Sequence, residues 1–316
     1  MEEPTVLVVT NIDDPTADLV INELNRRNVP VARMDPGDFP ASLTASARTA
    51  GDGGWGGALS TSSRTIPLDR VRSLYYRRPS GFSFPHLTAQ DERFAVTQAR
   101  YGLGGVLASL PGCRYVNHPN RIGDAEFKPL GLAVAGACGF AVPDTLITNE
   151  EAQAREFVEG RRSVIYKPLW VPLYTRDDTP QTIAVSMVTA EELDDSIAGT
   201  MHLLQERVEK AYDVRVTVMG ERVFAVRIDS GLLDWRTDYT VHTYKEERVP
   251  PAIVCSLHAY LSRLGLVFGA FDFAVDHEGV WWFLECNPSG QWAWLEEETG
   301  LPMVAALADL LTQGTE

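Results

Sequence analysis

Residues 270–287 read AFDFAVDHEGVWWFLECN, and they decide the fold class because two apolar, strand-like runs flank a turn. Asp-His-Glu-Gly at 276–279 supplies turn residues, so the stretch predicts a hairpin. Residues two apart in a strand point to the same face, so Glu285 and Asn287 project together while Cys286 points away. Pairing across the hairpin is expected to bring Asp272 beside them. Two carboxylates and one amide oxygen suit Mg²⁺, which also binds nucleotide phosphates.

The alternative for this stretch is an acidic sheet face that binds no metal. Polar groups inside apolar strands are costly unless something satisfies them. The sequence therefore favours a metal site made by Asp272, Glu285 and Asn287.

Several cationic residues suit a polyphosphate ligand. Lys167 ends the apolar run SVIYKP, a costly place for an ammonium group unless an anion meets it. Lys128 precedes a helix, and Arg215 and Arg227 lie on the two arms of a hairpin predicted around Gly220. Taken singly, each is better explained as a solvated or salt-bridged residue. Together with the metal face, they offer the charge neutralisation that phosphoryl transfer requires.

Residues 204–216 (LQERVEKAYDVRV) lie between these groups. A strand edge from Glu206 to Val208 would offer backbone donors and acceptors to adenine, and Asp213 would accept from ribose hydroxyls. Spacing alone is weak support for either contact. The chain has no G-x-x-x-x-G-K-[ST] loop, which excludes a P-loop enzyme.

The first part of the chain has the pattern of an α/β domain. Strands are expected at 5–10 and 29–34, with a helix between them that begins after Asp14 and Pro15. Further on, the pattern predicts a strand at 71–76 and a helix at 89–110. No G-x-G-x-x-G turn follows the first strand, so a dinucleotide site there is not expected.

Composition narrows the class of protein. The chain has 316 residues, which favours two or three subdomains, and 45% hydrophobic residues, which suffice for a large core. A net charge of −15 argues against nucleic acid as the main partner and is compatible with a basic peptide. The four cysteines are far apart in the sequence, which argues against a zinc site. No signal peptide or membrane span is apparent, so we expect a soluble, cytoplasmic protein without a membrane partner.

The order and spacing of these motifs resemble the ATP-grasp superfamily from about Val116 to the C-terminus. The resemblance implies an α/β fold of three subdomains: an N-terminal Rossmann-like pre-ATP-grasp domain (1–116), a central subdomain (117–204) and a C-terminal subdomain (205–316). It implies ATP and Mg²⁺ as cofactors. It implies that Lys128 and Lys167 contact the phosphates of ATP, that Glu206 and Val208 contact adenine, and that Asp213 contacts the ribose. It also implies that Arg215 and Arg227 contact the phosphates or an acyl phosphate. Mg²⁺ would be held by Asp272, Glu285 and Asn287. Catalysis would rest on Arg215, Arg227 and Lys167.

A narrower resemblance covers nearly the whole chain. Its motifs look like those of graspetide synthetases of the microviridin type, nearest their actinobacterial branch. These motifs are YYRRPSGFSFP (75–85), NHP at Asn117, KPL at Lys128 and Lys167, TLITN at Thr145, DWR at Asp234 and ECNPSGQWAWLE (285–296). The resemblance implies a homodimer that binds the leader of a precursor peptide and phosphorylates core Asp or Glu side chains. Ser or Thr would then form ω-esters, or Lys an ω-amide.

Two alternatives stay open. One is an ATP-grasp ligase for free amino acids or a protein tail, similar to glutathione synthetase or a glutamate ligase. The other is a non-catalytic ATP-binding scaffold. The YYRRP and GQWAWLE motifs favour the peptide maturase over the first, and the complete set of lysines and metal ligands weighs against the second.

Substrate contacts are predicted from position and resemblance. Arg77 and Arg78 follow a strand end, where α/β proteins place ligand sites, although a salt-bridged surface pair is the alternative. The leader is expected to dock on a hairpin at 174–186 and the acidic cluster after it, although acidic pairs also open helices. The candidates are Arg77, Arg78, Asp234, Arg236, Ser289, Asp177, Asp178, Glu191 and Asp195. Residues 168–178 contain no glycine, so no phosphate lid is assigned there.

Overall fold

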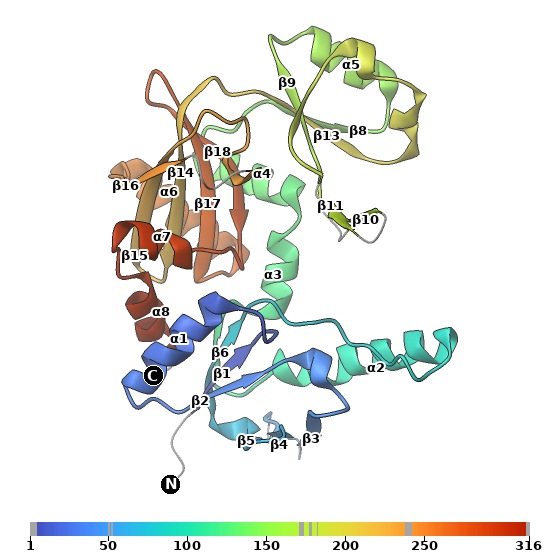
Figure 1. Cartoon of the computed structure of the whole chain (residues 1–316), viewed down its shortest axis with the longest axis vertical. Helices are drawn as coiled ribbons and strands as arrows, with labels where there is room; N and C mark the ends of the chain where they lie inside the picture. Colours follow the sequence, from blue (N-terminus) through green and yellow to red (C-terminus); the bar gives the residue numbers. More distant parts are fainter. Residues whose placement is uncertain are drawn as a thin grey trace.

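The computed structural model describes residues 5–49, 51, 53–170, 174–176, 179–181, 183–237 and 242–313. In this part of the chain, no helix is long and apolar enough to cross a membrane. The described residues form five sheets, which lie in three regions stacked along the long axis of the molecule (Figure 1).

A parallel sheet forms the core of the N-terminal region, with the strand order β2-β1-β6-β7. Its strands are β1 (Thr5–Val9), β2 (Val31–Met34), β6 (Val71–Tyr76) and β7 (Arg114–Val116). Helix α1 (Pro15–Arg26) connects the first two strands, and Asp14 caps it by accepting from the Ala17 amide, as the sequence predicts. Helix α2 (Ala89–Leu107) projects to the side (Figure 1), and a small antiparallel sheet contains β3 (Thr44–Arg48), β4 (Gly56–Ser60) and β5 (Thr65–Pro67).

The C-terminal region is built on an antiparallel sheet with the order β16-β15-β14-β17-β18. These strands are β14 (Lys210–Met219), β15 (Arg222–Asp229), β16 (Thr243–Glu246), β17 (Phe268–Asp276) and β18 (Trp281–Asn287). Helix α6 (Pro251–Leu264) packs on one face through a cluster that includes Phe271, Phe273 and Phe283. Helices α7 (Ala293–Thr299) and α8 (Met303–Thr312) follow, and α8 lies against α1 of the N-terminal region (Figure 1).

The central region contains the sheet β12-β9-β13-β8 and helix α5 (Glu151–Glu159). Its strands are β8 (Thr145–Thr148), β9 (Val164–Lys167), β12 (Ser186–Val188) and β13 (His202–Glu206). Two short 3₁₀ helices, η3 (Ala190–Glu192) and η4 (Asp195–Gly199), lie between β12 and β13. Their paired acidic residues cap these turns instead of continuing a helix.

Strands β10 (Tyr174–Arg176) and β11 (Thr179–Gln181) pair antiparallel, as expected for the hairpin in this segment. Asp177 and Asp178 lie outside the described residues. Glu191 and Asp195 lie on η3 and η4 and are exposed. Their predicted leader-binding role stays a prediction.

Two helices link the regions. Helix α3 (Pro119–Ala125) and helix α4 (Lys128–Ala137) belong to the segment expected in the central subdomain, yet they pack with α6 and β18 of the C-terminal region. The Phe283 amide also donates to the Ala141 carbonyl. Helix α4 ends at Ala137, and Gly139 follows with a φ of 87°. This packing places Lys128, at the start of α4, beside the metal-ligand strand.

Candidate nucleotide and metal site

A β-bulge places the predicted metal ligands on one face of the C-terminal sheet. From Val275 to Phe273, β17 pairs with β18 in one register, and the register then shifts so that Asp272 lies opposite Glu285. Without this shift, Asp272 would lie opposite Leu284, and Glu285 would point to the other face. Asn287, two residues further, shares the face of Glu285. The three predicted ligands are therefore together, and this oxygen-only donor set fits Mg²⁺.

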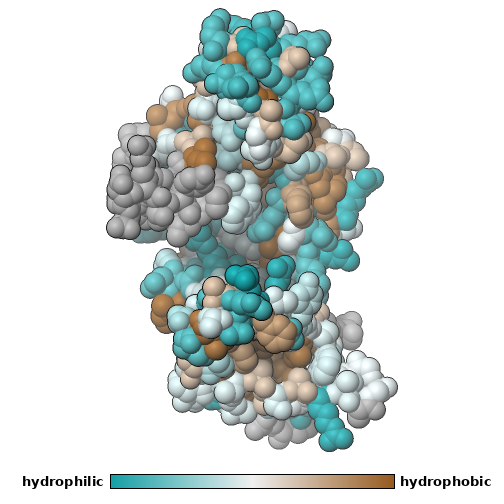
Figure 2. All heavy atoms as spheres, turned by 90° about the vertical axis from the view of Figure 1, so that its right-hand side faces the viewer, coloured by the Kyte–Doolittle hydropathy of each residue, from teal (hydrophilic) through white to brown (hydrophobic). Residues whose placement is uncertain are grey.

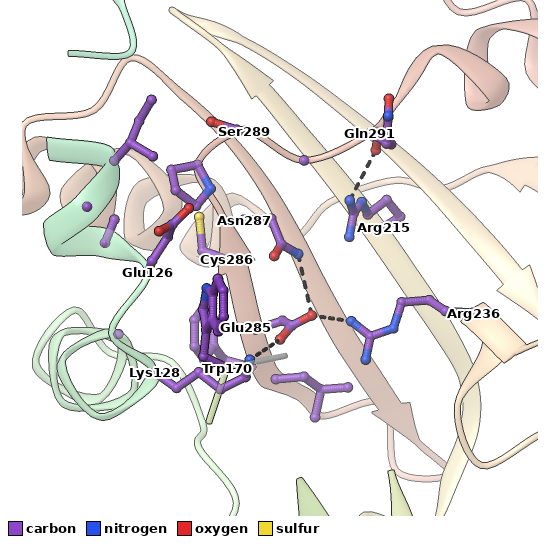
Figure 3. A pocket seen from close by; sticks show the side chains of 18 of the residues that line it. Glu126, Lys128, Trp170, Arg215, Arg236, Glu285, Cys286, Asn287, Ser289 and Gln291 are labelled. Carbon is purple, nitrogen blue, oxygen red and sulfur yellow. Dashed lines mark hydrogen bonds and ion pairs between the residues drawn. The ribbon is translucent and has the colours of Figure 1, made fainter. Parts of the chain in front are cut away.

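Cationic side chains surround the two carboxylates (Figure 3). Nη1 of Arg215 lies 2.8 and 2.7 Å from the two oxygens of Asp272, and Nη1 of Arg236 donates to Glu285 Oε1. Nζ of Lys128 is 3.6 Å from Glu285 Oε2. Burial alone would raise the pKa of Glu285, but the charges of Arg236, Lys128 and Lys167 outweigh it and hold the pKa below its usual range. Glu285 is therefore ionised at neutral pH.

Two adjoining hollows open beside this face, and Figure 2 shows the surface hollowed at mid-height. The larger one, of about 840 Å³, is lined by residues from all three regions. The smaller one, of about 440 Å³, lies between the central and C-terminal sheets. Residues of the Glu285 cluster line both: Lys167, Trp235, Arg236, Leu284 and Glu285. Together the two hollows have room for a nucleotide and a second substrate that meet at Glu285.

The smaller hollow contains part of the predicted adenine and ribose set. Asp213 is buried, its Oδ2 accepts from Lys210 Nζ at 2.7 Å, and burial raises its pKa to about 6, against the effect of Lys210. Val208 lines the hollow, but Glu206 does not, and the Glu206 amide already donates to the Asp144 carbonyl. Adenine and ribose contacts stay predictions, best placed at Val208 and Asp213.

Lys167 lies at the end of β9, where the two hollows meet. Its Nζ donates to Gln205 Oε1 at 2.7 Å, and Gln205 Nε2 in turn donates to Thr145 Oγ1 at 2.9 Å. Burial lowers the pKa of Lys167 to about 8, although the negative charge of Glu285 opposes this shift. Gln205 was not singled out from the sequence, although it belongs to the QERV motif. Its buried amide orients the ammonium group toward the hollow.

We expect the affinity for ADP to fall as the pH rises from about 7 to about 10, because Lys167 is charged below a pKa of about 8 and neutral above it. Titration calorimetry measures this affinity directly. Lys167→Gln should bind ADP more weakly at pH 7 and show a flatter pH profile, whereas the exposed control Lys245→Gln should keep the wild-type profile. A wild-type affinity that stays constant across this range would contradict the phosphate role of Lys167.

Arg227 is not placed with the other cations, which corrects the prediction for it. In the register of β14 with β15, Arg227 lies opposite Val214, whereas Arg215 lies opposite Val226. Arg227 therefore points to the face of the sheet opposite to Asp272. It donates to Asp229 Oδ1 at 2.8 and 2.6 Å and stacks on Tyr212. We therefore do not include Arg227 among the phosphate-binding or catalytic residues.

Arg77 and Arg78 differ, although they are adjacent. The Arg77 side chain is fully buried: its guanidinium donates to both oxygens of Asp14 at 3.1 and 3.2 Å, to the Gly290 carbonyl at 3.1 Å and to Gln291 Oε1 at 3.0 Å. Arg77 also lines the larger hollow, but these partners occupy its guanidinium, so it joins the N-terminal region to the loop after β18. Its predicted substrate contact stays a prediction. Arg78 is exposed and lines the larger hollow.

Gln291 is a second residue whose role the sequence did not reveal. Its side-chain oxygen also accepts from Thr16 Oγ1 at 2.7 Å, and its carbonyl accepts from Arg215 Nη2 at 3.1 Å (Figure 3). The loop after the metal ligands is thus held from both sides. Three further substrate candidates line the hollows: Ser289 the larger, Asp234 the smaller, and Arg236 both.

This chain is similar to a protein-family model over its N-terminal region and to solved structures over nearly its whole length. Residues 5–123 match a family model described as the MvdD pre-ATP grasp domain. A RiPP-associated ATP-grasp ligase from Chryseobacterium gregarium, solved with ADP and a leader and core peptide, is 24% identical and has a TM-score of 0.90, covering 99% of this chain and 98% of that one. The chain has the ATP-grasp fold. The three-subdomain fold expected from the sequence is confirmed.

Two other solved structures that are similar to this chain are macrocyclases from Microcystis aeruginosa MRC. MdnC, bound with the precursor peptide MdnA, is 26% identical with a TM-score of 0.88, and MdnB is 28% identical with a TM-score of 0.83. Each match covers 98% of this chain and 99% of the other. A comparison with curated proteins finds no match. The resemblance of this chain to peptide macrocyclases, expected from the sequence, is confirmed.

Proposed function

We propose that this ATP-grasp chain is a macrocyclising ligase that acts on a ribosomally made precursor peptide in the cytosol. The observation that supports this most is the pair of adjoining hollows that meet at the Asp272–Glu285 face. The smaller has the size for a nucleotide and a largely apolar lining that includes the charged side chains of Lys167, Lys210 and Asp213. The larger reaches the N-terminal region, where a peptide would enter. Two macrocyclases share this architecture over nearly their whole length.

The proposed reaction has two steps. A core Asp or Glu carboxylate of the peptide attacks the γ-phosphorus of ATP, which forms an acyl phosphate and releases ADP. A Ser or Thr hydroxyl, or a Lys amine, then attacks the acyl carbon, and phosphate leaves as the ω-ester or ω-amide forms. Lys128, Lys167 and Arg215 are proposed to hold the phosphate oxygens, because preorganised cations stabilise the charge that moves during transfer.

Asp272, Glu285 and Asn287 would hold Mg²⁺, which when bound neutralises charge on the nucleotide phosphates. Arg215 keeps Asp272 oriented through the two short contacts with both carboxylate oxygens. Arg78 and Ser289, which both line the larger hollow, are proposed to contact the peptide. Ser289 Oγ suits this role because it is buried and makes no hydrogen bond within the described part of the chain.

The test uses short peptides encoded beside this gene that contain clustered Thr or Ser and Asp or Glu. With ATP and Mg²⁺, we expect each bond to remove one water from the peptide mass and to release one phosphate. Free glutamate, other free amino acids and a glutamate-rich protein tail are the comparison substrates. Phosphate release with those substrates and not with any peptide would favour the amino-acid ligase instead.

We also propose a homodimer, as the resemblance implies. The support from this chain is the projecting helix α2, whose exposed face carries Phe94 and Tyr101, with 67% and 76% of their surface accessible. Light scattering of the purified chain tests this directly. A monomer at micromolar concentration would contradict it.

A further inference from the structure

Arg236 contacts the carboxylate oxygens that a metal ion on this face would use (Figure 3). Its Nη1 donates to Glu285 Oε1 and lies 3.8 Å from Asp272 Oδ2. Mg²⁺ binds carboxylate oxygens at about 2.0–2.1 Å and carries two positive charges. While Nη1 of Arg236 holds Oε1, its positive charge repels a metal ion at the same carboxylate. Metal binding at Glu285 is therefore weakened as long as Arg236 stays on this carboxylate.

The side chains around Glu285 carry more positive than negative charge. Four cationic side chains act on it: Arg236, Lys128, Lys167 and Arg215. Three carboxylates accompany them: Asp234, Asp272 and Glu285 itself. A positive excess of this kind repels a free divalent ion and attracts the phosphates of a nucleotide. The face is thus poorly suited to a metal ion alone and well suited to a metal that arrives with phosphates.

Arg236 has a second anchor that would keep it in place after it releases Glu285. Its Nε donates to Asp234 Oδ1 at 2.9 Å and its Nη2 to Asp234 Oδ2 at 3.0 Å. The Nη1 atom is the one that contacts Glu285. Because Arg236 lines both hollows, a rotation about the Asp234 contact would move this atom from Glu285 into the space where the nucleotide is proposed to bind.

We propose that Arg236 is a positioning residue that makes metal binding depend on the nucleotide. It holds Glu285 until phosphates offer its guanidinium another anionic partner, and the metal then enters together with the nucleotide. This inference rests on the metal site of the proposed function and adds the order in which that site fills.

The experiment measures Mn²⁺ binding to the full chain by electron paramagnetic resonance and water proton relaxation, with and without saturating ADP. Wild type should bind Mn²⁺ with ADP and show no binding in the micromolar range without it. Arg236→Gln should bind Mn²⁺ without ADP, tighter than wild type by about tenfold or more, since one positive charge next to a divalent ion is removed. Arg236→Lys should restore most of the dependence on ADP.

Two further variants make the result specific. Arg248→Gln removes an exposed arginine outside both hollows and should behave as wild type. The double variant Arg236→Gln/Glu285→Gln should lose the gained Mn²⁺ binding, which places that ion at Glu285. Equal Mn²⁺ affinity with and without ADP in wild type, or no gain in Arg236→Gln, overturns the inference while the metal site stands. A chain that binds no Mn²⁺ even with ADP overturns the metal site itself.

Discussion

Replacing Glu285 with glutamine is expected to lower peptide-dependent phosphate release more than about a hundredfold while the chain stays folded, because electrostatic stabilisation of a transferring phosphoryl group typically contributes several kcal/mol. Glu285 is the centre of the charge network: it contacts Arg236 and Lys128 and lies opposite Asp272. The glutamine keeps the shape of the side chain but removes the negative charge that both the metal and the cations need. A coupled assay for released phosphate measures the loss.

The matched control for this variant is Glu278→Gln, the same chemical change in the exposed turn between β17 and β18. It should keep full turnover. Circular dichroism of both variants confirms that each remains folded. Full turnover by Glu285→Gln would show that the metal assignment is wrong.

Arg77→Ala is expected to cost about 3–5 kcal/mol of the free energy of unfolding, whereas Arg78→Ala should change it by less than about 0.5 kcal/mol. Asp14 is fully buried and its carboxylate is paired with Arg77, so the alanine leaves a buried charge without its partner. Burial would raise the pKa of Asp14, and Arg77 instead holds it below its usual value. Arg78 is exposed, and its side chain contributes little to stability.

Chemical denaturation followed by tryptophan fluorescence measures both variants. The double variant Asp14→Leu/Arg77→Met should be more stable than Arg77→Ala, because it removes both charges together. If Arg77→Ala were as stable as Arg78→Ala, the buried pair would contribute nothing and the join between the regions would rest on other contacts.

The sequence predicts the metal-ligand hairpin well because its signals are local. Alternating apolar residues and the turn at 276–279 identify β17 and β18, and period-two geometry puts Glu285 and Asn287 on one face. The bulge that brings Asp272 to the same face is not visible in the pattern. It depends on how Leu284 is accommodated between the paired strands, which is a property of the folded sheet.

The side chains whose positions the sequence does not reveal depend on strand register or on partners far away in the chain. Arg227 and Arg215 both lie on predicted hairpin arms, and only the register shows that they point to opposite faces. Arg77 resembles a surface cation in sequence, because its partners Asp14 and Gln291 are 63 and 214 positions away. Such contacts come from the packing of whole regions, which single-sequence patterns do not encode.

The most direct test of the central claim follows oxygen atoms from the peptide into phosphate. A precursor whose core Asp and Glu carboxylates carry isotopically labelled oxygen is incubated with the chain, ATP and Mg²⁺, and the released phosphate is analysed by mass spectrometry. Activation through an acyl phosphate predicts one labelled oxygen in the phosphate for each ring bond formed, with ADP as the other product. Ring formation with unlabelled phosphate, or with AMP instead of ADP, would contradict the account.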